Sequence, residues 1–288
     1  KIRNFNYFVG LNVTLARQKN GKRDSELFYN AIDRYRWSQS DRWANVTQGR
    51  VWMWESIGVF QTQEQIDNYP VNIDGSNNTT LVPGDIIFKD VNGDGVIDDL
   101  DKRPLGYASV DWPWAAGSEG GNKNPLMSLG FNFGFEWKGI DLAADFAGGF
   151  MNTFVPDWGL KWGASRAVNG YVYNNLNVWH HEDIFDPTSP WVPGDFPALR
   201  TYNPSSRSDD DFYTQKINYL RLRNLVVGYT LPQTWTRKAY IQKLRFYFEG
   251  SNLFCWDSMG KFGFDPEIST TNGRDYPQHR TFTIGVNI

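Results

Sequence analysis

The amino-acid sequence predicts an all-β fold: a section of an antiparallel transmembrane β-barrel with long loops at one end. Several stretches of strand length alternate between large apolar and small or polar residues, so each would have two unlike faces. No run of roughly 18 apolar residues is present, so no membrane-spanning helix is expected. Short and long connections alternate between the stretches. Together these features are typical of a barrel with lipid outside and water inside.

The first three predicted strands cover residues 3–16, 125–137 and 140–152. In the first, aromatic and aliphatic residues alternate with mostly small or polar ones over about the 9–11 residues that cross a bilayer. In the second, a Leu, three Phe and a Trp oppose Gly, Asn and Glu. The third has apolar residues on one face, with Asp141 and Asp145 on the other. All three therefore suit a wall between lipid and water.

The last three predicted strands cover residues 214–231, 244–256 and 280–288. The fourth strand is mixed, because Arg221 and Arg223 share the parity of its apolar residues. A lipid-facing Arg at the bilayer midplane costs about 2–4 kcal/mol, so we expect both to lie beyond the hydrocarbon band. The fifth and sixth strands alternate more cleanly, with the charged residues of the fifth directed into the lumen.

The connections predict which end of the sheet is which. Residues 138–139 and 232–243 are short, whereas 17–124, 153–213 and 257–279 are long and rich in Gly, Pro, Asn, Asp and Trp. Short turns face the periplasm and long loops the cell exterior in outer-membrane barrels. Because an open sheet edge cannot exist in lipid, either further copies or the rest of a longer polypeptide must close the wall. The second interpretation is favoured.

Composition narrows the function classes. Aromatic residues make up 16% of the chain and include 13 Trp, yet the mean hydropathy is -0.53, which disfavours a bundle of spanning helices. The net charge of -3 gives no basic surface for nucleic acid. A single cysteine, Cys255, excludes an internal disulfide. No residue pattern selects a pair of catalytic carboxylates or a nucleophile, so the chain is not expected to be an enzyme.

Residues 90–101 match the spacing of a twelve-residue calcium-binding loop. Gly95 allows the sharp turn, and hard oxygen ligands favour Ca²⁺ over a transition metal. The sequence before the loop looks extended, so a helix-opening sensor is not expected, and the alternative is a turn without an ion. The expected ligands are Asp90, Asn92, Asp94, Val96 through its carbonyl, Asp98 and Asp101, which replaces the usual Glu.

Tryptophans in the long connections are a second candidate site. Their rings have flat apolar faces and a polar N–H, which suits stacking on sugars, contact with a partner protein, or packing among loops. The candidates for substrate or partner contact are Trp112, Trp114, Trp158 and Trp162. For any single Trp, packing or a membrane-interface position is the stronger interpretation.

Several motifs, spread along the whole chain, resemble those of the SusC/RagA group of TonB-linked outer-membrane transporters. They include PGDIIFKDVNGDGVID at 83–98, YLRLRNLVVGYTLP at 219–232, LRFYFEGSNLFCW at 244–256, and GFDPE at 263–267. The resemblance implies that residues 1–288 are the C-terminal segment of a barrel of about 22 strands. Residues 17–124 would be a long extracellular loop region containing the calcium loop, and residues 125–288 the terminal strands and loops. The plug domain is not present.

The resemblance also implies a function and partners. Such a protein imports glycans or peptides across the outer membrane of a Gram-negative, Bacteroidota-like cell. A SusD-like surface lipoprotein forms the lid, and the TonB–ExbB–ExbD complex supplies energy through the missing N-terminal part. The alternative is a secreted, calcium-stabilised β-sheet carbohydrate-binding module. A module would bury its apolar faces between two sheets, whereas a barrel exposes them to lipid.

Overall fold

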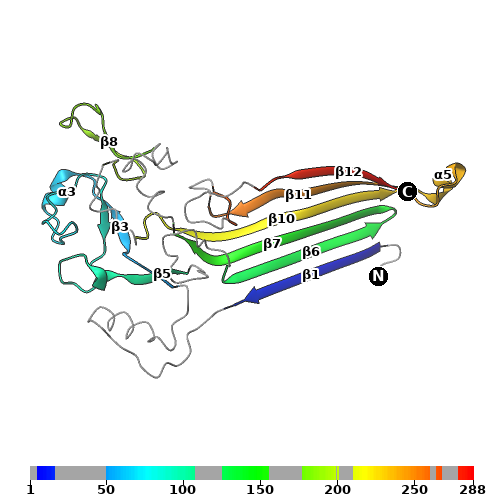
Figure 1. The fold of residues 1–288 in the computed structure, drawn as a ribbon, viewed down its shortest axis with the longest axis horizontal. Helices are drawn as coiled ribbons and strands as arrows, with labels where there is room; N and C mark the ends of the chain where they lie inside the picture. The colour runs from blue at the N-terminus through cyan, green and yellow to red at the C-terminus, as the bar shows by residue number, and fades with distance from the viewer. Residues whose placement is uncertain are drawn as a thin grey trace, which may run out of the picture.

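The computed structural model describes residues 5–16, 50–107, 125–155, 177–198, 200, 210–259, 264–267 and 278–288. Within them, six long strands form one antiparallel sheet in the order β1-β6-β7-β10-β11-β12 (Figure 1). All six predicted strands are confirmed, with ends that shift by at most two residues. Their bounds are β1 Phe5–Leu15, β6 Met127–Trp137, β7 Ile140–Phe154, β10 Gln215–Thr230, β11 Arg245–Asp257 and β12 Thr281–Asn287.

The register of the sheet places apolar residues opposite apolar residues. Val9 pairs with Phe133 between β1 and β6, and Phe131 pairs with Phe146 between β6 and β7. The rings of Phe133 and Phe146 are stacked diagonally across these strands, 6.3 Å apart. A slip by one residue would move a whole strand's apolar set to the other face, so these cross-strand pairs fix the register.

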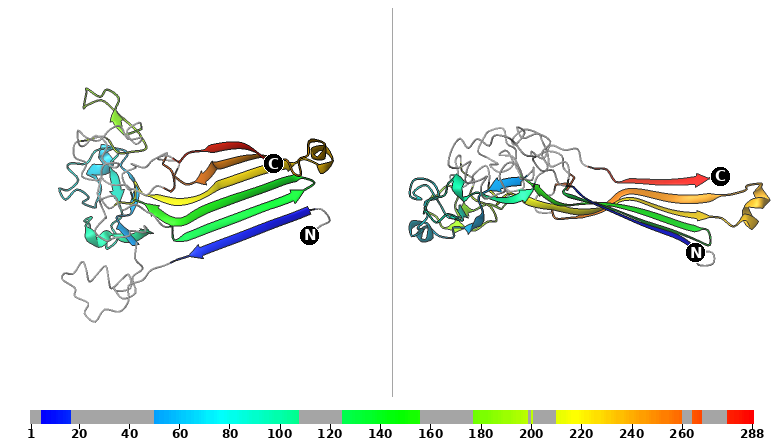
Figure 2. Two further views of the ribbon diagram at one scale, coloured as in Figure 1. Left: turned by 45° about the vertical axis from the view of Figure 1, so that its right-hand side comes forward. Right: turned by 90° about the horizontal axis from the view of Figure 1, so that it is seen from below.

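Two short connections lie at one end of the sheet, and residues 50–107 and 177–198 of the long connections lie at the other (Figures 1 and 2). Lys138 and Gly139 join β6 to β7 with φ angles of 49° and 90°, as a tight hairpin of matching twist requires. Gly139 must also lack a side chain, because a Cβ there would lie 2.6 Å from the carbonyl oxygen of Thr230. The second connection contains α5 Gln233–Thr236 and the 3-10 helix η3 Arg237–Ala239.

The long connections are folded at the other end of the sheet. We call the described residues of 50–107 and 177–213 the loop domain. Its sheets are two-stranded: β2 Arg50–Met53 pairs with β5 Arg103–Tyr107, and β3 Ser56–Val59 pairs with β4 Ile86–Phe88. The other elements are α3 Gln63–Asp67, the 3-10 helix η1 Asp99–Asp101, and the hairpin of β8 His180–His181 and β9 Trp191–Val192.

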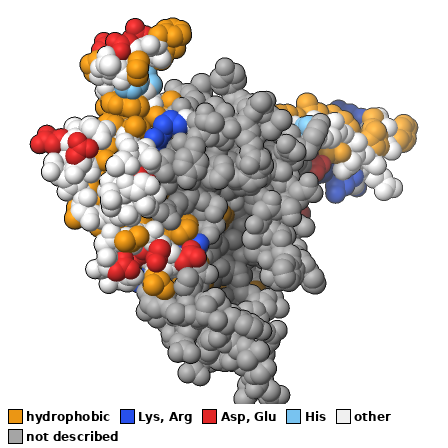
Figure 3. Space-filling model, turned by 60° about the vertical axis from the view of Figure 1, so that its left-hand side comes forward, with side chains coloured by type: hydrophobic (Ala, Val, Ile, Leu, Met, Phe, Trp, Pro, Cys, Tyr) orange, Lys and Arg blue, Asp and Glu red, His pale blue; other side chains and the backbone are white. Residues whose placement is uncertain are grey.

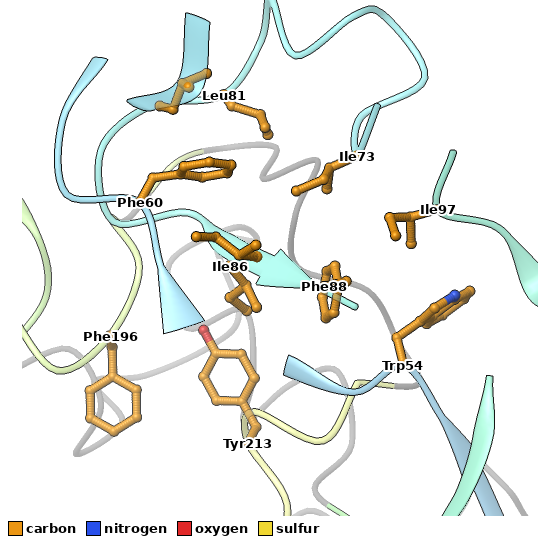
Figure 4. Close-up of a cluster of buried hydrophobic side chains, with 11 residues drawn as sticks. Trp54, Phe60, Ile73, Leu81, Ile86, Phe88, Ile97, Phe196 and Tyr213 are labelled. Carbon is orange, nitrogen blue, oxygen red and sulfur yellow. The ribbon is translucent and has the colours of Figure 1, made fainter. Parts of the chain in front are cut away.

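The main hydrophobic core of the described residues belongs to the loop domain, not to the large sheet. Side chains from residues 54–97 and 196–213, which belong to two of the long connections, meet there (Figure 4). The cluster consists of Trp54, Phe60, Ile66, Ile73, Leu81, Ile86, Ile87, Phe88, Ile97, Phe196 and Tyr213. The short strand β4 is buried on both faces, which explains its uninterrupted run of apolar residues.

Candidate functional site

One face of the large sheet is apolar and exposed. Leu11 is 66% exposed, Phe282 64% and Ile284 84%, although such residues normally lie in a core. Seen edge-on in Figure 2, the described strands form a single layer. Others exposed on this face are Tyr7, Val9, Val13, Leu15, Trp137, Ile140, Val227, Tyr229, Phe246 and Val286. The face is therefore built to contact an apolar environment that the described residues do not supply.

The opposite face is small, polar and charged, as predicted. Asp141 of β7 and Arg245 of β11 form an ion pair of 2.5 Å that passes over β10. Gly228 of β10 lies beneath the pair, and a Cβ at this position would approach both partners to 2.5 Å. The glycine therefore leaves the space in which the two charges meet. Paired charges on this face suit a water-filled lumen.

A β-bulge in β10 corrects one prediction. The register shifts between Leu222 and Asn224 against both neighbouring strands. The extra residue reverses the alternation of faces, so Leu222 pairs with Phe146 on the apolar face and Arg221 pairs with Ala147 on the polar face. The expectation that Arg221 shares the apolar face is therefore wrong, whereas its place relative to the hydrocarbon band stays a prediction.

The same correction applies to Arg223, because both arginines bind one acidic segment over the polar face. Arg221 donates two hydrogen bonds to Asp265, of 2.6 and 2.7 Å. Arg223 pairs with Glu267 and also donates to Gln278 at 3.2 Å. Gln278 in turn donates to Glu267 at 2.9 Å. Residues 264–267 are thereby fixed to the wall, and a cavity of about 270 Å³ lies beside them.

Two contacts join the long connections into the loop domain. Asp85 is fully buried and forms a two-oxygen ion pair of 2.5 Å with Arg200 of the other connection. Next to it, Gly84 has φ of 90° and packs against Trp179, where a Cβ would lie 2.4 Å from the indole ring. The Pro-Gly-Asp run at residues 83–85 therefore lies at the contact between two loops that are about one hundred residues apart in the sequence.

The backbone of the predicted calcium loop folds back on its first residue, Asp90, in a tight turn. Gly93 and Gly95 have φ of 77° and 82°, and their N–H groups donate to the Asp90 carboxylate at 2.7 and 2.8 Å. Asn92 donates to Asp94 at 2.8 Å. The first three predicted ligands therefore share one turn.

The remaining predicted ligands serve the loop itself. The buried carboxylate of Asp101 accepts from the backbone of Val91 at 2.8 Å and of Asp98 at 2.9 Å, which ties the start of the loop to its end. Asp98 caps η1 through its bond from Leu100. Val96 forms a bridge with a neighbouring segment. Among the described residues, no three acidic, His or Cys side chains converge as a metal site, and calcium binding stays a prediction.

Charge and burial also shift acidities in the loop domain. Burial and, after it, the charge of Asp90 raise the pKa of Tyr69. Burial would raise the pKa of Asp74, but hydrogen bonds from Thr80, Ser76 and Asn78 outweigh it and lower that pKa below its usual value. The Asp74 carboxylate thus organises the turn that follows it.

The tryptophans predicted to contact substrate or partner lie outside the described residues: these are Trp112, Trp114, Trp158 and Trp162. In the hairpin of β8 and β9, His180 and His181 each contact a backbone carbonyl through Nδ1. His181 also stacks on Trp191 with centroids 4.0 Å apart. These contacts give both rings a structural role in the β8–β9 hairpin.

No helix among the described residues has the length and apolar character to span a membrane.

No protein-family model matches the chain. It is 27% identical over 259 residues to TonB-dependent receptor P3 of Formosa agariphila, which covers 81% of this chain and 22% of that relative. TonB-dependent receptor P39 of the same bacterium is 25% identical over 253 residues, with 80% and 22% covered. The chain thus spans 22% of the length of these relatives.

Solved structures show the same fold. The structure of the RagAB peptide transporter matches with a TM-score of 0.60 and 20% identity, covering 99% of this chain and 27% of that chain. The RagAB peptide importer in the closed-closed state matches with a TM-score of 0.57 and 20% identity, with the same coverage. The relatives confirm the predicted resemblance to TonB-dependent receptors, and the structures confirm the predicted fold. As predicted, these relatives are receptors and transporters, not enzymes.

Proposed function

We propose that this chain is part of a TonB-dependent transporter that imports peptides or glycans across an outer membrane. One observation carries the proposal: a single-layer sheet whose aromatic and aliphatic face is exposed while its other face holds paired charges. Lipid is the solvent that suits the first face, and water suits the second. The similarity to TonB-dependent receptors supports the same conclusion.

In this proposal the six strands are the C-terminal section of a closed barrel of about 22 strands, the size class that encloses a plugged lumen. The long connections are extracellular and the short turns periplasmic. The protein performs no chemistry on its substrate. It binds the substrate on the loop side, and energy from TonB–ExbB–ExbD opens a passage past the plug along the polar face.

The loop domain is proposed to receive the substrate beneath a SusD-like lipoprotein. It is folded around its own core and lies at the end of the sheet opposite the two short turns (Figure 1). Trp112, Trp114, Trp158 and Trp162 are the proposed aromatic contacts to substrate or lid. Peptide is the cargo that the name of the RagAB transporter gives for that protein, and glycan is the other class.

The carbohydrate-binding module is the weaker candidate. A β-sandwich buries the apolar faces of two sheets against each other, about 10 Å apart. Here the corresponding side chains are exposed on a single layer of described strands, as the 84% exposure of Ile284 illustrates. The apolar core that does exist belongs to the loop domain.

Calcium is proposed as a structural ion in the loop of residues 90–101. The closed backbone and the shared turn of Asp90, Asn92 and Asp94 support this proposal. Asp98, Asp101 and the carbonyl of Val96 would complete the ligand set. Bound there, the ion would stiffen the segment that supplies Ile97 to the loop-domain core.

Extraction and uptake test the proposed function. Cells that make the full-length protein are fractionated with and without detergent, and uptake of labelled oligopeptides and oligosaccharides is compared in cells with and without its gene. We expect recovery only with detergent, and uptake of at least one cargo class that requires both the gene and TonB. Recovery in the aqueous phase without detergent would contradict the proposal and favour the module.

A further inference from the structure

The two short turns at the end of the sheet opposite the loop domain are unusual in charge. Residues 231–244 contain Arg237, Lys238 and Lys243 and no acidic residue, and the neighbouring turn contributes Lys138. The whole chain has a net charge of -3. The turns are adjacent, since the Thr230 N–H donates to the Gly139 carbonyl at 2.7 Å. Together they form a cationic surface, which we call the basic rim.

Aromatic side chains on the basic rim face solvent. Trp235 is 64% exposed and Tyr240 is 98% exposed. The other turn also places an aromatic ring beside a cation: the Lys138 ammonium lies 4.8 Å from the centroid of the Trp137 indole. In Figure 3 apolar and basic side chains lie together at the tip where α5 projects. Exposed apolar side chains that gather beside polar residues mark a surface that contacts a partner or a membrane.

The backbone holds these side chains in place. The Leu231 N–H donates to Leu244 at 2.9 Å and closes the connection at its base. Thr236 is buried, and the Ile241 N–H donates to its carbonyl at 3.1 Å. Tyr240 ends η3 in the left-handed conformation, with φ of 58°. The rim is therefore a formed turn that presents rings and cations outward, not a loose loop.

The basic rim continues the exposed apolar face of the sheet. Tyr229 and Phe246, which flank the connection, belong to that face and are 39% and 45% exposed. Beyond the apolar residues of the strands, the connection therefore adds amphipathic rings and cations. An apolar band that borders amphipathic rings and cations suits a membrane leaflet, in which acyl chains border an interface and charged phosphates.

We propose that the basic rim binds the phosphate-bearing headgroups of anionic phospholipid in the leaflet at this end of the barrel. Arg237 and Lys238 pair with the headgroup charge, Trp235 and Tyr240 occupy the interface, and Lys138 extends the surface to the next turn. The inference rests on the proposed membrane location and adds a lipid preference to it.

Lipid binding to the full-length protein in neutral detergent tests this. Short-chain phosphatidylglycerol is titrated below its micellar concentration, with phosphatidylcholine of equal chain length as the neutral probe. We expect phosphatidylglycerol to bind more tightly, and R237Q/K238Q to lose about 30-fold in that affinity, since each charge near an anionic surface contributes roughly fivefold. Trp235→Ala should weaken both lipids, because the ring contributes independently of charge.

Lys216→Gln is the matched control, because Lys216 is exposed at the opposite end of β10. It should leave both affinities unchanged, and circular dichroism checks that each variant is folded. Equal binding of the two lipids, equal affinity of wild type and R237Q/K238Q, or binding of free glycerol phosphate as tight as that of the lipid would overturn the inference. Failure of the proposed function is detected separately, as extraction without detergent.

Discussion

Single residues in this protein decide how charge is accommodated on the polar face and in the loops. Gly228 leaves room for Asp141 to meet Arg245, and the bulge after Leu222 turns Arg221 away from the apolar face. In the loop domain the carboxylates of Asp90 and Asp101 accept backbone N–H groups in the predicted calcium loop. Each case satisfies a charge locally, which burial or lipid would otherwise penalise.

Calcium titration of the full-length protein tests the loop at this scale. We expect Asp90→Ala and Asp94→Ala each to weaken calcium affinity at least about tenfold, because each removes a negatively charged oxygen ligand. Asp99→Asn is the control, since Asp99 is outside the ligand set and pairs with Lys102 at 3.0 Å. Unchanged affinity in both alanine variants would exclude this loop as the site.

At the scale of elements, each long strand separates two environments. Consecutive residues of β1 demonstrate it: Leu11 pairs with Phe131 on the apolar face, and Asn12 pairs with Gly130 on the polar face. The strand is covered on neither side by described residues. Its stability therefore depends on which solvent each face meets, and an added charge should have a large effect at one position and a small effect at its neighbour.

Leu11→Lys is expected to destabilise the folded, membrane-inserted protein by about 2–4 kcal/mol, the cost of a lipid-facing cation near the bilayer midplane. Asn12→Lys, one residue away on the water-filled side, should change stability by less than about 1 kcal/mol. The measurement is the folded fraction in lipid vesicles across a urea series. A similar loss for both variants would mean that the two faces do not meet different solvents.

The whole molecule is divided along its length. A two-faced sheet occupies the middle, a folded loop domain one end and the basic rim the other (Figure 1). The loop domain is held together because residues from its two segments, 50–107 and 177–213, form one core and one buried ion pair. The described segments of the two connections therefore depend on each other for stability.

Asp85→Ala should destabilise the loop domain by about 3 kcal/mol, because it leaves the Arg200 charge without its buried partner. Lys89→Ala removes an ion pair with Glu55 that is partly exposed, and should cost less than about 1 kcal/mol. Denaturant unfolding of the full-length protein, followed by tryptophan fluorescence, distinguishes the two. Equal small effects would mean that the connections do not depend on one another.

The sequence by itself determined the sheet: its six strands, their faces, and the short and long ends. Period-two alternation is a local signal that is present within each strand. The pairing of the strands then keeps the apolar residues of neighbouring strands on the same face. The motifs that resemble the SusC/RagA group likewise indicated, from the sequence alone, which proteins the chain is similar to. Local spacing also indicated the turn formed by Asp90, Asn92 and Asp94.

Only the tertiary structure decided the rest. The bulge that moves Arg221 depends on the register against two neighbouring strands, which no single strand encodes. Asp85 pairs with Arg200, and Gly84 packs against Trp179. Both contacts join segments that are far apart in the chain, so local sequence patterns cannot predict them. Long-range contacts are set by the packing of whole elements, whereas alternation is set residue by residue.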